Sequence, residues 1–270
     1  MSLPSPAPDR TALVTGASSG IGTELARELA RRGQNVTLVA RSESKLRELA
    51  EELSATGVRA DVLATDLSDR AARTSLPDRV AEQGNVVSVL VNNAGLSTMG
   101  PVHRAAVDAE LHMVEVDVVA VVDLCTRFLS GMVERGSGAV LNVASTAAFQ
   151  PLPGQAGYGA GKTFVLSYTR SIGGELRGTG VTATALCPGP VHTGFGEAAG
   201  ISHDDAEATL PSFMWESPAA VAKCGIDALA AGRPVAIPGP ANRAGAALVG
   251  LVPKQLLVPL LASRHPSLRD

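Results

Sequence analysis

The chain contains 270 residues, 45% of them hydrophobic and 18% charged, and its formal net charge is −3. This composition allows a sizeable buried core, and the lack of a basic excess argues against a nucleic-acid-binding protein. Cys125, Cys187 and Cys224 are widely spaced and form no CxxC pair, so we expect buried free thiols in a reducing compartment, the cytoplasm, and neither disulfides nor a zinc site. Residues 1–9 have no basic start and no apolar run, which favours a disordered tail over a signal peptide.

From residue 10 onward, short apolar stretches alternate with longer stretches of helical periodicity. This pattern predicts strands and helices in alternation. The strands are expected over residues 11–15, 35–40, 58–64, 86–91, 138–144, 181–186 and 235–237. The helices are expected over residues 20–32, 43–55, 68–83 with an interruption near Pro77, 107–135, 154–177 and 218–231. Such alternation forms right-handed βαβ units, so we predict an α/β fold, a Rossmann-type doubly wound parallel sheet of about seven strands in three α/β/α layers.

No linker divides residues 10–238, which we interpret as a single domain. Residues 188–216 are rich in glycine, proline and acidic residues and lack a sheet pattern, so we expect a substrate loop there. Within it, Met214 and Trp215 could line an apolar pocket or pack the loop against the body, and packing is favoured. Residues 239–270 form an apolar C-terminal extension, whose prolines interrupt it too often for a membrane span.

The first strand runs directly into TGASSGIG at residues 15–22, and a helix follows. In such a turn Gly16 permits a tight bend, Gly20 lets the backbone approach a pyrophosphate, and Gly22 allows close packing of helix on strand. The helix N-terminus then presents N–H groups and a positive dipole end to the phosphates. Although the spacing GxxxGxG could belong to a structural turn, its position between strand and helix predicts a dinucleotide-binding and catalytic domain.

Three further strand ends suggest contacts with a dinucleotide. Ala40 ends the second strand and Arg41 follows, which favours a 2′-phosphate and NADP over NAD; a plain surface arginine is the alternative. Asp66 follows the third strand and could accept from the adenine amino group or, equally, cap a helix starting at Ser68. The sequence NNAG at residues 92–95 follows the fourth strand, where small and amide residues suit a backbone passing close to a cofactor.

Tyr158 and Lys162 are four residues apart, so a helix places them on one face. A nearby ammonium stabilises a phenolate and lowers the tyrosine pKa, which would make Tyr158 an acid–base group. Ser145 ends the preceding strand at the carboxyl edge of the sheet, where its hydroxyl could polarise a substrate carbonyl. Each residue alone is more often structural, but together after a glycine turn they predict hydride transfer by a bound nicotinamide cofactor.

These motifs, together with PGPVHT at residues 188–193, resemble the short-chain dehydrogenase/reductase family over roughly residues 10–238. The resemblance implies NADP(H), with Arg41 marking the NADP-preferring subgroup, a small carbonyl or alcohol substrate, and a homodimer or homotetramer. It also implies that Val191 and Thr193 contact the nicotinamide carboxamide and that Asn93 lies near the cofactor. We expect the remaining cofactor contacts at Ser18, Ser19, Ile21, Leu67, Ala94, Gly95, Tyr158, Lys162, Pro188 and Gly189.

The sequence departs from the family at one candidate catalytic position. The family usually has an asparagine in the long helix that completes a proton relay with serine, tyrosine and lysine. Here residues 114–119 read VEVDVV, and Asp117 occupies that place. A carboxylate can accept hydrogen bonds from water and lysine, so a working relay is possible. The alternative is a shifted helix in which Asp117 faces solvent.

The predicted function is an NADP(H)-dependent oxidoreductase, either a carbonyl reductase or the reverse alcohol dehydrogenase. No HxxxH or HExxH pair indicates a metal site, and Ser145 lacks the GxSxG context of a serine hydrolase. The alternatives are a non-catalytic NADP(H)-binding regulator of the same fold and a membrane-surface lipid or ketoacyl reductase that uses residues 244–262 as an anchor. Of these possibilities, we favour a freely dissolved enzyme over one that contacts a membrane.

Overall fold

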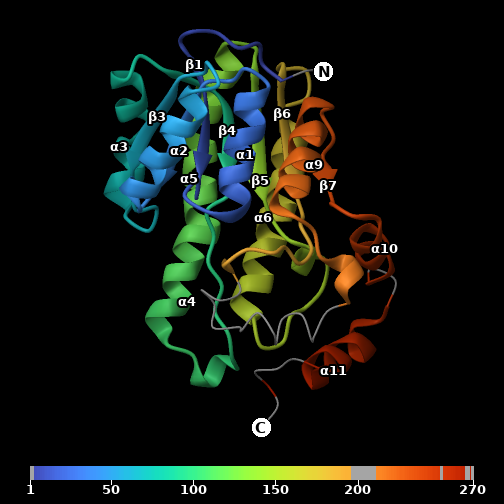
Figure 1. The fold of residues 1–270 in the computed structure, drawn as a ribbon. Helices are drawn as coiled ribbons and strands as arrows, with labels where there is room; N and C mark the ends of the chain where they lie inside the picture. The colour runs from blue at the N-terminus through green and yellow to red at the C-terminus, as the bar shows by residue number, and fades with distance from the viewer. Residues whose placement is uncertain (1–2, 196–210, 250–251, 265–267, 269–270) are drawn as a thin grey trace.

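The computed structural model describes residues 3–195, 211–249, 252–264 and 268. Within them, seven strands form one parallel sheet in the order β3-β2-β1-β4-β5-β6-β7 (Figure 1). The strands are β1 (Arg10–Thr15), β2 (Val36–Ala40), β3 (Ala60–Ala64), β4 (Val86–Asn92), β5 (Gly138–Val143), β6 (Val181–Leu186) and β7 (Val235–Ala236). The chain leaves β1 in one direction across the sheet and returns to β4 on the other side. In open α/β sheets ligands bind outside the carboxyl ends of the strands at such a reversal, here at β1 and β4.

Helices cover both faces of the sheet. They are α1 (Gly20–Arg31), α2 (Glu43–Ser54), α3 (Arg70–Glu82), α4 (Val107–Val114), α5 (Ala120–Glu134), α6 (Ala156–Glu175), α9 (Pro218–Ala230), α10 (Pro240–Val249) and α11 (Lys254–Arg264). Short helical turns lie at Val102–Arg104, Thr146–Phe149 and Ser212–Met214. Figure 1 shows α1, α2 and α9 on one face of the sheet.

Two hydrophobic cores result from the alternation of side chains along the strands. Ala12 and Val14 of β1 point into the core beneath α1, α2 and α9, whereas Leu13 points into the core beneath α3, α5 and α6. Because both faces are covered, the strands are apolar without a polar alternation. The predicted doubly wound sheet in three layers is therefore confirmed, with strand and helix ends that differ from the expected ones by one to two residues in most cases.

The structure corrects two helix predictions. The expected break near Pro77 is absent, because α3 continues through it to Glu82. Pro77 removes one backbone hydrogen bond, and the burial of Leu76 and Val80 against the sheet offsets that loss. The helix expected over residues 107–135 is helical throughout, but five residues form a π turn, η2 (Glu115–Val119), between α4 and α5. A π turn adds a residue and changes which side chains face inward.

No helix in the described part of the chain has the length and apolar composition that a membrane span requires. The three cysteines form no disulfide; Cys125 and Cys187 are buried as expected, whereas Cys224 is only half-buried. Burial raises the pKa of both buried thiols to about 12, and hydrogen bonds and positive charges near them only partly oppose that shift. These two thiols are therefore neutral at physiological pH.

Candidate active site

The glycine turn after β1 has the backbone geometry that its sequence predicts. Gly16 and Gly20 have φ values of +64° and +57°, in the left-handed region that favours glycine. A Cβ atom on Gly22 would lie 2.1 Å from the carbonyl oxygen of Gly16, so no other residue fits there without moving backbone. Ser18 and Ile21 are half-buried in this turn and Ser19 is exposed, with no side-chain cap on the α1 N-terminus. The first N–H groups of α1 are therefore directed toward an anion site.

The segment after β4 closes over this turn through Asn93. Its Nδ2 donates to the carbonyl oxygen of Thr15 at 2.9 Å, and its backbone N–H donates to Thr15 Oγ1 at 2.9 Å. The Ala94 N–H donates to the same hydroxyl at 3.1 Å. Asn93 thus holds the glycine turn in shape. Its position beside that turn also places it near any cofactor bound there.

Arg41 and Asp66 lie at the ends of β2 and β3, away from the catalytic candidates. Both are exposed. The backbone and side chain of Ser68 donate to Asp66 Oδ1 at 2.9 and 2.8 Å; the backbone hydrogen bond in particular lowers the Asp66 pKa, and the positive charge of Arg41 adds to this. Asp66 therefore closes a turn at Ser68, but it does not cap the helix: α3 begins at Arg70 and its N-cap is Asp69.

The three catalytic candidates come together at the carboxyl edge of β5. Ser145 lies two residues after the end of this strand, and its Oγ accepts from the Ala147 N–H at 3.1 Å. Tyr158 and Lys162 both lie on α6, with Lys162 Nζ 5.6 Å from the centre of the Tyr158 ring. Lys162 is only 4% exposed and donates to the carbonyl oxygen of Val143 at 3.2 Å. A hydroxyl and a phenol thus lie together at this edge of the sheet, with a buried ammonium near the phenol ring.

The electrostatics of Tyr158 differ from the sequence-based expectation. Burial raises its pKa; Lys162 and a hydrogen bond with Ser145 lower it, Asp117 raises it, and the net direction is upward. The lysine therefore acts in the expected sense, but it does not bring the tyrosine pKa below its ordinary value. At neutral pH the phenol consequently carries its proton.

Asp117 reaches this site from η2. It is 2% exposed; its Oδ2 lies 3.0 Å from Lys162 Nζ, and its Oδ1 accepts from the Leu96 N–H at 2.7 Å. Burial lowers the Lys162 pKa, but Asp117 and Tyr158, with a smaller contribution from Cys187, together outweigh burial and the net direction is upward. A Cβ on Gly95 would lie 3.1 Å from Lys162 Nζ and 3.2 Å from Asp117 Oδ2, so glycine makes room for this pair. The alternative in which Asp117 faces solvent is wrong.

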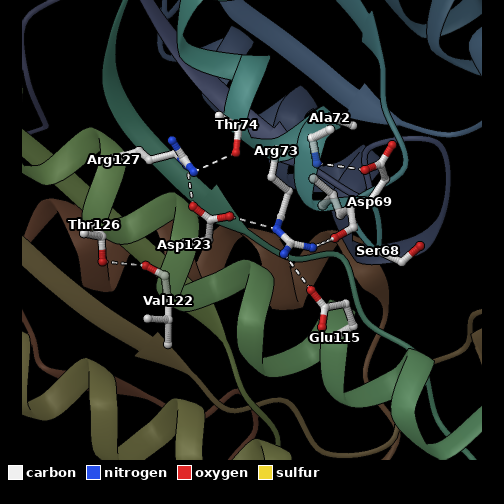
Figure 2. A network of polar contacts seen from close by, with 12 residues as sticks. Ser68, Asp69, Ala72, Arg73, Thr74, Glu115, Val122, Asp123, Thr126 and Arg127 are labelled. Carbon is white, nitrogen blue, oxygen red and sulfur yellow. Dashed lines mark hydrogen bonds and ion pairs between the residues drawn. The ribbon is translucent and has the colours of Figure 1, made fainter.

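A buried arginine holds the π turn that presents Asp117. Arg73 of α3 is 1% exposed, and its guanidinium lies 2.6 Å from Glu115 of η2 and 2.9 Å from Asp123 of α5 (Figure 2). It also donates to the carbonyl oxygen of Leu67, in the segment after β3, at 2.5 Å. No local pattern in the sequence indicates this network, because Arg73 is 42 and 50 residues from its two acidic partners and each of the three looks like an ordinary helix-surface charge.

The first part of the predicted substrate loop returns to the glycine turn. Pro188 accepts from the Thr146 N–H at 2.8 Å, and Val191 forms a parallel bridge with Glu216. A Cβ on Gly20 would lie 3.2 Å from Thr193 Cγ2, which places Thr193 beside the phosphate turn. Phe195, which the sequence did not single out, has its ring centre 5.8 Å from that of Tyr158.

The last described part of this loop packs on the first part of the loop and on α10. Trp215 stacks on His192 at 4.8 Å, and the carbonyl oxygen of Met214 accepts from Asn242 Nδ2 of α10 at 3.0 Å. A Cβ on Gly189 would lie 2.3 Å from Asn242 Oδ1, so α10 packs directly against this segment. Residues 196–210 of the expected substrate loop lie outside the described residues.

The residues present fit a nicotinamide dinucleotide. The left-handed glycines and the close approach at Gly22 leave backbone room for a pyrophosphate, and the uncapped α1 N-terminus supplies donors to it. Within the described residues, no group of three or more histidine, cysteine or acidic side chains could hold a metal ion. What the arrangement can do chemically is to bind a dinucleotide and transfer a proton beside it.

Comparison with known proteins gives consistent results. The sequence profile of the short chain dehydrogenases matches residues 10–202. A protein of Streptomyces coelicolor described as a ketoacyl reductase is 41% identical over 184 residues, which cover 67% of this chain and 70% of that protein. A short-chain dehydrogenase from Sphingobium yanoikuyae, solved with NADPH, superposes with a TM-score of 0.79 at 30% identity and covers 93% of this chain and 95% of its own. A variant of actinorhodin polyketide ketoreductase, solved with NADPH, superposes with a TM-score of 0.74 at 34% identity and covers 85% of this chain and 95% of its own. Other similar structures hold NADP or NAD.

Proposed function

The chain belongs to the short chain dehydrogenase family, and from this premise we propose that it is an NADP(H)-dependent oxidoreductase acting on a carbonyl or the corresponding secondary alcohol. The observation that carries the proposal is the meeting of Ser145, Tyr158 and Lys162 at the carboxyl edge of β5, beside the glycine turn. A non-catalytic regulator would have no need for a buried lysine beneath a tyrosine at this place. The NADPH-bound state of two similar structures supports the choice of cofactor.

In this proposal the residues have separate roles. The bound nicotinamide supplies or accepts the hydride. Ser145 donates a hydrogen bond to the substrate oxygen and polarises the carbonyl, while Tyr158 gives its proton to that oxygen or takes one from it. The turn at residues 16–22 would hold the pyrophosphate, Arg41 the 2′-phosphate, and Val191 with Thr193 the carboxamide.

The substrate class is proposed from the surroundings of Tyr158. The Phe195 ring stands beside the phenol, and an apolar wall suits a ketone with a hydrophobic substituent. The similarity to proteins described as ketoacyl and polyketide reductases supports the same class. We also propose that the active form is the homodimer or homotetramer expected from the sequence.

The experiment is a panel of ketones, secondary alcohols and acyl thioesters, followed by the absorbance of NADPH. We expect oxidation of NADPH with at least one apolar ketone or ketoacyl thioester. Loss of that activity in Tyr158→Phe would assign it to this site. A wild-type protein that binds NADPH but turns over no member of a broad panel would instead favour the regulator.

A further inference from the structure

The charges beneath Tyr158 include a buried acid as well as the lysine. Asp117 of η2 faces Lys162 of α6 at 3.0 Å, and both side chains are almost inaccessible to water. Cys187, after β6, also lies near Lys162 but stays a neutral thiol, because burial raises its pKa to about 12. Glu110 of α4 lies beside Gly157, where a Cβ would meet its Oε2 at 2.4 Å. Asp117 is thus the acidic side chain in direct contact with Lys162.

The pairing changes what the lysine does to the tyrosine. A lone buried ammonium would stabilise the phenolate strongly, since charges interact more strongly away from water. An adjacent carboxylate cancels part of that field and repels the phenolate directly. The upward direction of the Tyr158 pKa, to which Asp117 contributes after burial, agrees with this reasoning.

The carboxylate is held in place from two sides. The Leu96 N–H fixes Oδ1 at 2.7 Å, and Glu115, two residues before Asp117 in the same π turn, is held by the buried Arg73 at 2.6 Å (Figure 2). Asp117 therefore cannot turn away from Lys162 without breaking the Leu96 hydrogen bond. Because this geometry is fixed, the Asp117 carboxylate continuously offsets the charge of Lys162.

We propose that Asp117 is a positioning residue that pairs with Lys162 and offsets its stabilisation of the Tyr158 phenolate, so that at neutral pH the site works as a carbonyl reductase. This inference rests on the proposed function and adds the direction, reduction of the carbonyl, in which the reaction runs at neutral pH. In that direction a bound reduced nicotinamide would supply the hydride to the carbonyl carbon, and the C=O π electrons would become a lone pair on oxygen. The Tyr158 O–H bond breaks and its proton forms the alcohol O–H; water then returns a proton to the phenolate. The products are the secondary alcohol and the oxidised cofactor.

The reverse direction needs the phenolate as a base before reaction starts. Burial makes the phenolate scarce at neutral pH, and Asp117 keeps Lys162 from reversing this effect. Alcohol oxidation should therefore become fast only as the pH rises through the Tyr158 titration. Reduction should be nearly flat from slightly acidic to neutral pH. The overall equilibrium is unchanged; only the rate at a given pH in each direction differs.

The test exploits the presence of only two tyrosines in the chain, Tyr158 and Tyr168. In a Tyr168→Phe background, the ultraviolet absorbance of the phenolate reports the ionisation of Tyr158 without substrate. Adding Tyr158→Phe should abolish the signal and serves as its control. Asp117→Asn keeps the shape and an acceptor for Leu96 but removes the charge, so we expect its titration midpoint to fall by about one pH unit. Asp117→Glu, which keeps the charge, should leave the midpoint near that of the parent.

The outcomes separate the two proposals. An unchanged titration midpoint in Asp117→Asn overturns the role of Asp117. A phenolate already present at neutral pH in the parent protein overturns it as well, and this measurement does not require the Asp117 variant to fold. A shifted midpoint together with an oxidation profile displaced to lower pH supports it. A shifted midpoint in a protein that reduces no carbonyl compound leaves the pairing in place and refutes the proposed function instead.

Discussion

Arg41 stands exposed at the end of β2, near enough to Asp66 for its charge to lower the Asp66 pKa after the larger effect of the Ser68 hydrogen bond. An exposed guanidinium at this strand end can pair with a 2′-phosphate through charged hydrogen bonds. We predict that Arg41→Ala weakens NADPH binding by about 1.5–3 kcal/mol and leaves NADH binding nearly unchanged. Calorimetric titration of both cofactors checks this. Equal affinity of the wild-type protein for NADPH and NADH would contradict the role of Arg41.

Tyr158 is the residue on which the proposed chemistry depends. We predict that Tyr158→Phe lowers kcat by about 100-fold or more, the range of general acid–base catalysis, with little change in NADPH affinity. The reason is that the hydroxyl serves the reaction, whereas the ring still packs beside Phe195. Steady-state kinetics measure kcat, and cofactor titration measures the affinity for NADPH. A variant with most of its activity intact would end this mechanism.

At the scale of the element, α1 depends on a glycine that faces the strand turn. A Cβ on Gly22 would lie 2.1 Å from the Gly16 carbonyl oxygen and 2.5 Å from Asn93 Nδ2, atoms that are held by the sheet. We predict that Gly22→Ala displaces the phosphate turn and lowers NADPH affinity at least tenfold. Gly174→Ala is the matched control: Gly174 lies within α6 and has no atom within 4 Å of an added Cβ.

That control should leave cofactor affinity unchanged and stabilise the protein by about 0.5–1 kcal/mol, because alanine is the better helix former. Cofactor fluorescence titration and thermal unfolding of both variants provide the comparison. If Gly22→Ala bound NADPH like the wild type, the turn would not be the phosphate site.

The π turn is an element whose position depends on Arg73 (Figure 2). We predict that Arg73→Met destabilises the protein by about 2–4 kcal/mol, at or below the usual cost of breaking a buried ion pair, because Glu115 and Asp123 can still reach water. Chemical denaturation measures the loss. Arg127→Met is the control, since that arginine is more exposed and pairs with Asp123 from the same helix; its effect should stay near or below 1 kcal/mol.

The same network predicts a pH dependence. Burial raises the Asp123 pKa, but Arg73 and Arg127 outweigh burial, and the net direction is downward. A carboxylate with a lowered folded-state pKa contributes stability above its unfolded pKa and loses it as the pH falls through the folded value. The difference in unfolding free energy between wild type and Arg73→Met should therefore shrink below about pH 4. A difference that stays constant in acid would show that the arginine acts through packing alone.

For the whole molecule, the C-terminal extension joins the body through α10. Asn242 is buried, and it donates to Met214 of the substrate loop and packs on Gly189. On the outer side, Leu248, Leu256 and Leu260 are exposed, and such leucines are an aggregation hazard unless a partner or substrate covers them. Either the substrate loop or a partner subunit could cover these leucines, and the Asn242 contacts favour packing on the loop.

We predict that ending the chain at Gly239 raises KM or lowers solubility, because the loop segment at Met214 loses its support. Asn242→Ala tests the contact within the full chain and should raise KM without changing assembly. Kinetics and light scattering on both proteins distinguish the loop from the subunit interface. Unchanged kinetics, solubility and assembly in the truncated form would remove any role for the extension.

The alternation of strands and helices, the glycine turn and the Tyr158–Lys162 pair could be predicted from the sequence, because each depends on residues close together in the chain. Periodicity and spacing are local, and they decide the element type and which side chains share a face. The left-handed backbone conformations of Gly16 and Gly20 could likewise be expected, because glycine is the residue that adopts them most readily.

The partners of Asp117, Arg73 and Asn93 were decided by tertiary structure. Asp117 meets Lys162 from a π turn that Arg73 of α3 contacts, in a segment where the sequence predicts a regular helix. The upward pKa of Tyr158 likewise depends on burial and on a charge from another helix. Such contacts join elements far apart in the chain, and their energies depend on distance and exclusion of water, which no local pattern of residues records.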